Sequence, residues 1–338
     1  MSIDELVTTA AALVAPGQGI LAADESTGTM EKRLVAEGLE STEETRRRYR
    51  ELIVSTPGLG EWISAVILFD ETIRQSSKDG TPLQKVAASN NVIPGIKVDK
   101  GAKQLAAAPG EKVTEGLDGL RERLEEYVQL GAKFTKWRAV LNIGDHLPTP
   151  AGVHTNAHAL GRYAALSQEA GLVPMVEPEV LMDGSHTLQR AEEVTTDVLA
   201  QVFTELRKQN VVLEGIVLKP NMVVAGAECP QQPSVDEVAE ATVRALRRTV
   251  PSAVPGIAFL SGGQSDEQAT VHLDAINRRG PLPWQATFSF GRALLAPTLH
   301  TWAGKDENVD AAQRVLAHRA KLNAAARQGE YDPSLEGK

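Results

Sequence analysis

The feature that most constrains the fold of this chain is a series of short apolar stretches that alternate with helical patterns. The stretches are GILAAD from residue 19, SAVILF from 64, VIPGIKV from 92, KFTKWRAVL from 133, LVPMVEPEV from 172, LEGIVL from 213, GIAFL from 256 and ATFSFG from 286. Runs this short and this apolar are typical of strands in a parallel sheet that is covered on both faces. About eight such strands, alternating with helices, is the number that a closed (β/α)8 barrel uses.

Helix start signals occur between these stretches. A serine followed three residues later by glutamate marks a capping box, in which each side chain accepts a hydrogen bond from the other residue's backbone N–H. Three such pairs precede helical patterns: Ser2 with Glu5, Ser41 with Glu44, and Ser234 with Glu237. A final helix is predicted over about 306–329, where Gly329 ends it.

The length of 338 residues fits one α/β barrel as well as two ordinary domains. No stretch is rich enough in Pro, Gly or Ser to serve as an interdomain linker. We therefore predict an α/β fold with a single (β/α)8 barrel domain over residues 1–338. The barrel itself is expected at about 19–300, with extra helices at both ends of the chain. Two doubly wound domains are the alternative.

Composition narrows the class of protein. With 42% hydrophobic and 4% aromatic residues, the chain suits a folded core of aliphatic strands and alanine-rich helices. A net charge of −9 disfavours general binding to nucleic acids or anionic membranes. The lone Cys229 cannot form an internal disulfide, which fits a reducing compartment. Because the N-terminus lacks a signal-peptide pattern and no apolar run approaches ~18 residues, we expect a cytoplasmic location.

Charged residues stand in or at the carboxyl ends of five of the predicted strands, where the active sites of barrels gather. They are Asp24, Lys97, Lys136, Arg138, Glu177, Glu179 and Lys219. Residues i and i+2 of a strand point to the same side, so Lys136 lies with Arg138 and Glu177 with Glu179. A purely structural salt-bridge network is the alternative interpretation. Acids and bases on so many strand ends at once favour a reactive site.

Lys219 ends the sixth apolar stretch and is followed at once by proline, in the segment VVLEGIVLKPNM. Ionised lysine is rarely tolerated in such surroundings without a partner or a shifted pKa. A second lysine on a neighbouring strand, together with partial desolvation, would lower the pKa of Lys219 and free its amine near neutral pH. A free amine attacks carbonyl groups, and the resulting iminium permits cleavage of a carbon–carbon bond without a metal. Glu177 could then shuttle protons at the imine, and Asp24 could take a hydroxyl proton.

Glycines after the last two strands suggest a phosphate site. The segments are LSGGQS, with Gly262 and Gly263, and SFGRA, with Gly291 and Arg292. Barrels commonly bind a phosphate at this place with backbone N–H groups. The glycines let the backbone come close, and Arg292 can add charge-assisted hydrogen bonds. Taken alone, two glycines after a strand indicate only an ordinary turn.

Other motifs are interpreted as structural. His154 and His158 have helical i, i+4 spacing, but no adjacent carboxylate completes a zinc motif, so a surface pair is favoured. The glycines of GQGILA from 17 precede a strand, whereas those of a dinucleotide site follow one. The basic run RRRYR from 46 is interpreted as a solvated helix face. We expect no metal, no cofactor and no nucleic-acid partner.

Nine segments of the chain closely resemble the class I, Schiff-base type of fructose-1,6-bisphosphate aldolase. They are GILAADESTGTMEKRL, VILFDET, GIKVDKG, GLDGL, FTKWRAVL, VPMVEPEVL, LKPNMV, FLSGGQS and FGRAL. The similarity runs in register from about residue 10 to about residue 330. It implies a (β/α) barrel lyase that reversibly cleaves fructose 1,6-bisphosphate to dihydroxyacetone phosphate and glyceraldehyde 3-phosphate, in glycolysis and gluconeogenesis.

The resemblance also implies roles for individual residues. Lys219 matches the lysine that forms the Schiff base, and the matching acid–base residues are Asp24, Lys136 and Glu177. The groups that match phosphate and substrate contacts are Arg33 and Lys97 for the phosphate distant from the imine, Ser261, Gly262 and Arg292 for the nearer one, and Arg138 for the substrate. Thr29 stands where relatives often carry serine, and it retains the hydroxyl.

One departure concerns the C-terminus. Animal members of the family end in a tail whose last tyrosine takes part in proton transfer on the enamine. This chain ends in YDPSLEGK, and Tyr331 comes too early to match that residue. The group that protonates the enamine therefore stays open. The resemblance further implies a homotetramer. A barrel that only binds or scaffolds, and an aldolase for a seven-carbon bisphosphate or a monophosphate, are the alternatives.

Overall fold

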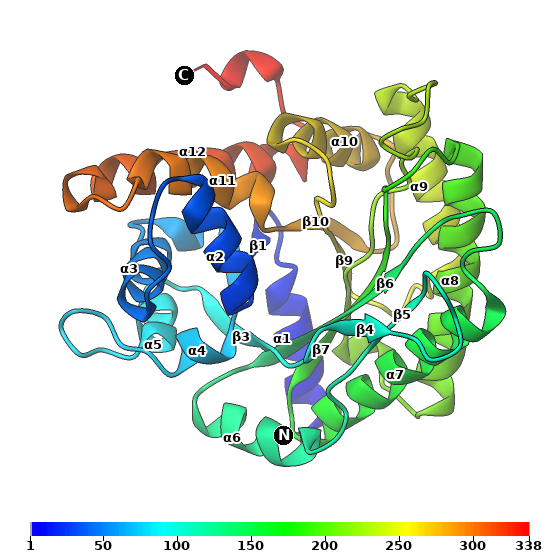
Figure 1. Cartoon of the computed structure of the whole chain (residues 1–338), viewed down its shortest axis with the longest axis horizontal. Coiled ribbons are helices and arrows are strands. Elements are labelled where there is room, and N and C mark those ends of the chain that lie inside the picture. The colour runs from blue at the N-terminus through cyan, green and yellow to red at the C-terminus, as the bar shows by residue number, and fades with distance from the viewer. Residues whose placement is uncertain (1, 338) are drawn as a thin grey trace.

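The chain forms a closed barrel of parallel strands in a computed structural model that describes residues 2–337 (Figure 1). Around the barrel the strands follow the order β1, β10, β9, β8, β7, β6, β3, β2. Their bounds are β1 (Gly19–Ala23), β2 (Ile63–Leu68), β3 (Ile93–Lys97), β6 (Phe134–Leu141), β7 (Val173–Val180), β8 (Val217–Leu218), β9 (Gly256–Phe259) and β10 (Gln285–Phe290). All eight predicted strands are therefore present, and the (β/α)8 prediction is confirmed.

Helices surround the strands (Figure 1). They are α1 (Ile3–Leu13), α2 (Thr27–Ala36), α3 (Glu43–Val54), α4 (Asp70–Ile73), α5 (Leu83–Ser89), α6 (Leu120–Gln129), α7 (Pro150–Glu169), α8 (Leu188–Lys208), α9 (Val235–Thr249), α10 (Asp266–Arg278), α11 (Arg292–Trp302) and α12 (Val309–Ala326). A short antiparallel hairpin, β4 (Ala102–Gln104) and β5 (Lys112–Thr114), follows β3 and has no counterpart in the sequence prediction.

Several predicted element boundaries differ from the structure. The sixth apolar stretch begins as a 3-10 turn, Leu213–Gly215, and only Val217–Leu218 is strand. The cap of α3 is Thr42 rather than Ser41, because the Thr42 hydroxyl accepts the N–H of Thr45. The terminal helix is α12 preceded by a 3-10 turn over Asp306–Asn308, and it ends three residues before Gly329. The capping boxes at Ser2 and Ser234 are confirmed.

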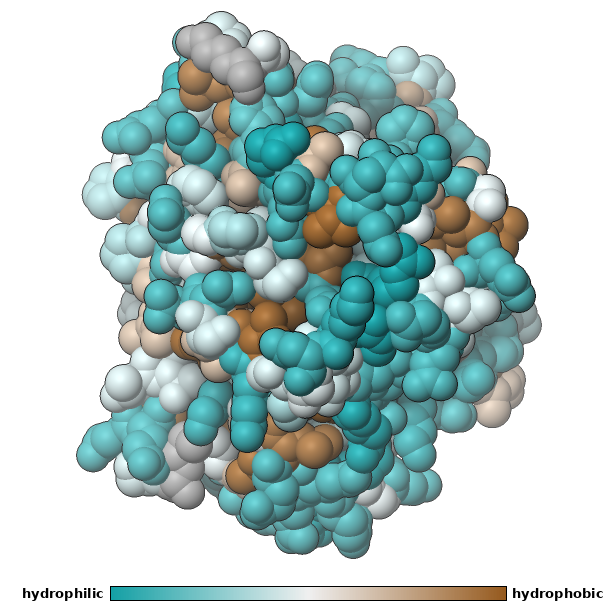
Figure 2. Space-filling model, turned by 90° about the vertical axis from the view of Figure 1, so that its left-hand side faces the viewer, coloured by the Kyte–Doolittle hydropathy of each residue, from teal (hydrophilic) through white to brown (hydrophobic). Residues whose placement is uncertain are grey.

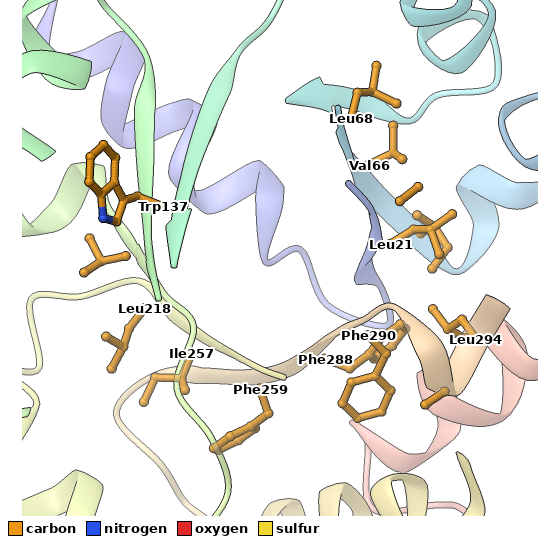
Figure 3. Packing of buried hydrophobic residues seen from close by; sticks show 14 of the residues in the cluster. Leu21, Val66, Leu68, Trp137, Leu218, Ile257, Phe259, Phe288, Phe290 and Leu294 are labelled. Carbon is orange, nitrogen blue, oxygen red and sulfur yellow. The ribbon is translucent and has the colours of Figure 1, made fainter. Parts of the chain in front are cut away.

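The strand residues separate into an inner and an outer core. Since successive side chains of a strand point to opposite faces, one set fills the barrel and the other meets the helices. The inner cluster contains Ile20, Ala65, Phe134, Met175 and Val217, together with Leu6, Ala10 and Leu13 of α1. The outer cluster contains Leu21, Val66, Trp137, Leu218, Phe259 and Phe288, which pack against helical residues such as Leu294 (Figure 3). Helix α1 therefore closes the amino end of the barrel, which leaves the carboxyl end for a site.

Hydrophilic side chains predominate on the face shown in Figure 2, and hydrophobic ones form small separate patches. Among the residues that the structure describes, the exposed large hydrophobic side chains are Ile3, Val35, Val128 and Val235. Within residues 2–337, none of the helices combines the length and the apolar character that crossing a bilayer would require.

Candidate active site

The inward-facing positions of the strands change from apolar to charged along the barrel. On β6, Phe134 belongs to the inner core, and the next residues with the same orientation are Lys136 and Arg138. On β7, Met175 is followed in the same way by Glu177 and Glu179. The charged side chains lie at the carboxyl end of the barrel, where a cavity of about 870 Å³ opens. This cavity is the candidate active site.

The cavity brings together twelve of the thirteen residues that the sequence analysis assigns to catalysis or to substrate binding. They are Asp24, Thr29, Arg33, Lys97, Lys136, Arg138, Glu177, Lys219, Ser261, Gly262, Gly291 and Arg292. The thirteenth, Gly263, does not line it. Its N–H donates to the Met182 sulfur at 3.1 Å, and a Cβ added at Gly263 would lie 2.4 Å from that sulfur. A packing contact therefore accounts for glycine at position 263.

A chain of alternating charges forms the floor of the cavity. The Lys219 Nζ lies 3.5 Å from Glu177 Oε1, and Lys136 Nζ lies 2.8 Å from Glu177 Oε2. Lys136 Nζ also lies 2.9 Å from Asp24 Oδ2. Each of these four residues is at most 8% exposed. Glu177 thus stands between the two ammonium groups, within reach of a proton from either.

These surroundings shift three pKa values in different directions. Burial lowers the pKa of Lys219, and the nearby Lys136 lowers it further, while Glu177 opposes both effects. Burial also disfavours the charged form of Lys136, but Asp24 and Glu177 outweigh it, so the pKa of Lys136 is raised. Burial alone would raise the pKa of Asp24, yet Lys136 and Lys219 hold it below its usual range. The site therefore separates a fixed cation and a fixed anion from an amine that can lose its proton.

The expectation of two lysines on neighbouring strands was wrong for this pair. Lys136 lies on β6 and Lys219 follows β8, and β7 separates these two strands. The reason is the strand order of the barrel, which places Glu177 of β7 between the two lysines. Burial is accordingly the largest cause of the lowered pKa of Lys219, and the second cation contributes less.

The strand β8 holds Lys219 through backbone contacts on both sides. Strand β8 is only two residues long. The N–H of Lys219, directly after it, donates to the Val176 carbonyl of β7 at 2.8 Å. Pro220 has no N–H, and its carbonyl accepts the Leu260 N–H beyond β9 at 3.0 Å. The side chain of Asn221 then accepts the Val180 N–H at 2.9 Å. Three successive residues therefore fix the direction of the lysine.

Two further ion pairs line the wall that β3, β6 and β7 form. Arg138 Nε lies 2.5 Å from Glu179 Oε2, and this carboxylate raises the pKa of Arg138 although burial opposes it. Lys97 Nζ lies 2.6 Å from Asp99 Oδ1. Sequence reasoning did not select Asp99, which follows β3 by two residues. The signal that could have found it is its position in VDK, close to a strand end.

Helix α2 borders the cavity and contributes the guanidinium group of Arg33 to it. Arg33 pairs with Glu25, and Arg50 Nη1 of α3 lies 2.7 Å from the other oxygen of Glu25. Thr29 lies one helical turn before Arg33, and its hydroxyl is 3.2 Å from that of Ser26. Sequence reasoning did not select Glu25, although its position next to Asp24 after β1 could have identified it.

The segments after β9 and β10 form the side of the cavity that lies across the barrel from β3 and β6. Gly262 has φ +57°, a conformation that favours glycine, and its carbonyl accepts from Arg292 Nη2 at 2.8 Å. A Cβ added at Gly291 would lie 3.1 Å from the Ala22 carbonyl oxygen. Ser289 also lines the cavity, and its hydroxyl has no hydrogen-bond partner among the residues that the structure describes. Sequence reasoning missed Ser289, although its inward position in ATFSFG could have identified it.

The two histidines with metal-ligand spacing, His154 and His158, lie outside the cavity and contact a glutamate of the next helix. His154 and His158 stack on α7 with ring centroids 6.0 Å apart, and both approach Glu205 of α8. Lys208 pairs with the same carboxylate at 2.8 Å. Over residues 2–337, no group of three His, Cys, Asp or Glu side chains is placed to hold a metal ion. The two histidines are therefore part of an ion-pair cluster between two helices.

Comparison with known proteins relates the whole chain to one family. A family model described as fructose-bisphosphate aldolase class-I matches residues 5–338. A probable class 1 fructose-bisphosphate aldolase of Xanthomonas campestris is 57% identical over 333 residues, which are 98% of this chain and 99% of the relative. The cytosolic fructose-bisphosphate aldolase 6 of Arabidopsis thaliana is 53% identical over 97% of this chain and 92% of its own length.

A solved structure agrees with the sequence comparisons. The chain superposes with a TM-score of 0.96 on fructose-bisphosphate aldolase of Plasmodium falciparum, which was crystallised in complex with TRAP and a small-molecule inhibitor. The two chains are 51% identical, and the match covers 97% of this chain and 95% of the other. The protein therefore belongs to the class-I fructose-bisphosphate aldolase family.

Proposed function

We propose that the protein cleaves fructose 1,6-bisphosphate reversibly through a Schiff base on Lys219. The observation that carries this proposal is a buried lysine whose pKa is lowered, 3.5 Å from the carboxylate of Glu177 at the mouth of a barrel. The neutral amine adds to the ketone carbon of the substrate, and loss of water leaves an iminium that draws electrons from the neighbouring bond.

Two buried carboxylates divide the proton transfers, and a buried lysine stabilises both. Glu177 gives a proton to the departing hydroxyl of the carbinolamine, since it lies between the two lysines. Asp24 is held ionised by Lys136 and takes the proton of the substrate hydroxyl as the carbon–carbon bond breaks. The aldehyde leaves first, and the enamine is then protonated and hydrolysed to dihydroxyacetone phosphate. Lys136 stays charged throughout and stabilises both carboxylates.

The cavity offers cationic groups on both sides of this centre. We assign the phosphate nearer the imine to Ser261, Gly262, Gly291 and Arg292, after β9 and β10. The distant phosphate would meet Arg33 and Lys97, with Thr29 as a hydroxyl donor, and Arg138 would contact the sugar. Cationic groups on both sides of the centre favour a substrate with a phosphate at each end over a monophosphate.

The proposed cellular setting follows from the relatives. Cytosolic aldolases of Arabidopsis thaliana are among them, so we propose a cytoplasmic enzyme of glycolysis and gluconeogenesis. Its partners are small-molecule sugar phosphates, and the family resemblance suggests a homotetramer.

Trapping of the covalent intermediate tests the proposal. Borohydride with dihydroxyacetone phosphate should attach the ketone to Lys219, as identified by mass spectrometry of the digested protein. Lys219→Ala should abolish the label and lower kcat by at least ~10³-fold, because the covalent contribution is worth several kcal/mol of the barrier. Lys321→Ala, on the exposed face of α12, is the matched control. Labelling that persists in Lys219→Ala would refute the assignment, and a chelator should leave cleavage unchanged.

Substrate comparison separates the alternatives. A protein that only binds or scaffolds would show no cleavage in an assay coupled to NADH oxidation. An aldolase for another sugar would show a higher kcat/KM for a seven-carbon bisphosphate or a monophosphate than for fructose 1,6-bisphosphate.

A further inference from the structure

The turn that follows β9 is held from behind by two side chains that do not touch the cavity. Residues 261–264 form a β-turn, closed by the Gln264 N–H and the Ser261 carbonyl at 3.2 Å. The Ser261 carbonyl accepts a second hydrogen bond from Gln264 Nε2 at 3.1 Å. The side-chain oxygen of Gln264 lies 2.5 Å from Nδ1 of His272, on α10. His272 and Gln264 are both buried.

The direction of each hydrogen bond in this chain is determined by chemistry. A backbone carbonyl only accepts, so the Gln264 NH₂ must face Ser261, and the amide oxygen must face His272. An amide oxygen also only accepts, so Nδ1 of His272 carries the hydrogen. Burial lowers the pKa of His272 to about 4, which leaves a neutral ring with that single N–H. The Nδ1–H of the imidazole thus satisfies the amide oxygen and stabilises this orientation of the Gln264 amide.

The orientation of the Ser261 carbonyl decides where the next N–H points. In a trans peptide the C=O and the N–H point in opposite directions. Because Gln264 draws the Ser261 carbonyl away from the cavity, the Gly262 N–H is directed toward the opposite side. Gly262 lines the cavity, and among the described residues its N–H has no hydrogen-bond partner. This free donor is suited to an anion.

We propose that His272 is a positioning residue, which acts through Gln264 to aim the Gly262 N–H at the phosphate nearer the imine. This inference rests on the proposed function, since it presumes a phosphate bound at Ser261 and Gly262. Neither His272 nor Gln264 lines the cavity, so their effect reaches the substrate only through the backbone of the turn. Long helical side chains point back toward the helix start, which brings His272 to the turn that precedes α10.

The test compares two ketones that differ only in the phosphate. Borohydride trapping on Lys219 is measured against the concentration of dihydroxyacetone phosphate and, separately, of unphosphorylated dihydroxyacetone. In His272→Leu the half-saturating concentration of dihydroxyacetone phosphate should rise about tenfold, the scale of one lost hydrogen bond. The half-saturating concentration of dihydroxyacetone should stay unchanged, because that ketone does not use the Gly262 N–H.

Further variants separate positioning from a general loss of stability. His272→Asn retains an N–H donor and should recover part of the affinity for dihydroxyacetone phosphate. Gln264→Leu should resemble His272→Leu, and the double variant should lose no more than the greater single one, because both act on one path. Ile276→Val, one turn further along α10 and fully buried, is the control and should not alter the affinity for either ketone.

Three results would overturn the inference. They are an equal loss of affinity for both ketones, no loss for dihydroxyacetone phosphate, and additive losses in the double variant. If His272→Leu does not fold, the comparison of Gln264→Leu with His272→Asn decides. If neither ketone labels Lys219 in the unmodified protein, the proposed function itself fails, which is a different outcome from an unchanged phosphate preference.

Discussion

At the scale of single residues, the fold disfavours the charged form of one lysine in the site and favours the charged form of the other. Burial lowers the pKa of Lys219, whereas Lys136 has two carboxylate partners at 2.8 and 2.9 Å. Removing one partner of a buried ion pair is costly, but removing a buried cation whose pKa is depressed can stabilise the folded chain. The two lysines should therefore respond to substitution in opposite ways.

Lys219→Met is predicted to raise the melting temperature at pH 7 while it abolishes cleavage. The pKa of Lys219 is lower in the folded chain than in the unfolded chain, so the folded chain binds fewer protons between these values. The stability of the unmodified protein therefore rises with pH through this window, and the cost is complete below the folded pKa. The advantage of the methionine variant should shrink as the pH approaches ~10.4, the ordinary value for lysine.

Thermal unfolding of both proteins between pH 6 and pH 10 would measure this difference. Lys321→Met, at an exposed position on α12, should change the melting temperature little at any pH. A lower melting temperature for Lys219→Met at pH 7 would contradict the prediction.

At the scale of elements, small residues in the strands make room for the aromatic rings of their neighbours. A Cβ added at Gly95 of β3 would lie 2.3 Å from the ring of Phe134, which heads β6 within the inner core. Both strands continue into the site, where Lys97 and Lys136 are register partners. The fit of a ring over a glycine thus supports the part of the barrel that carries two site lysines.

Gly95→Ala should destabilise the protein by about 1–3 kcal/mol, because the buried Phe134 ring has to move. Gly28→Ala is the matched control, since Gly28 lies in α2 and an added Cβ there meets no atom within 4 Å. That change should stabilise by about 0.5–1 kcal/mol through the lower entropy of the unfolded chain. The melting temperatures of the two variants would measure these opposite effects. A lower melting temperature in both would argue against the packing explanation.

At the scale of the whole molecule, one arginine after α12 joins the last helix to the segment between α1 and β1. Arg327, directly after α12, is 6% exposed and donates to the carbonyls of Val14, Ala15 and Gln18, between α1 and β1. Its Nη2 also donates to Gln285 Oε1, at the start of β10, at 2.6 Å. One guanidinium therefore connects both terminal helices to two barrel strands.

Arg327→Met should destabilise the protein by about 2–4 kcal/mol, because it removes the guanidinium donors to the buried Val14 carbonyl and to Gln285 Oε1 and weakens the contacts at Ala15 and Gln18. Arg327→Lys should recover only part of this loss, since one ammonium cannot reproduce the geometry of a guanidinium. Denaturant-induced unfolding would measure both, with Arg314→Met on the exposed side of α12 as the reference. Equal stability of the lysine and arginine proteins would show that the charge alone matters.

Much of this architecture can be predicted from the sequence, because local patterns determine it. All eight barrel strands coincide with apolar stretches, and twelve of the thirteen predicted site residues line one cavity. Boundaries were less certain: Thr42 rather than Ser41 caps α3, since both hydroxyl residues precede the same helix. The single barrel domain over residues 1–338 stays a prediction.

The sequence by itself determined which strand residues share a side and which of them carry charge, because a strand alternates its side chains with a period of two. Only the tertiary structure decided which charges meet. The strand order inserts β7 between β6 and β8, so Glu177 lies between two lysines. The contact of His272 with Gln264 depends likewise on how α10 packs behind the turn after β9. Such pairings arise from the closure and packing of the barrel, which no local pattern encodes.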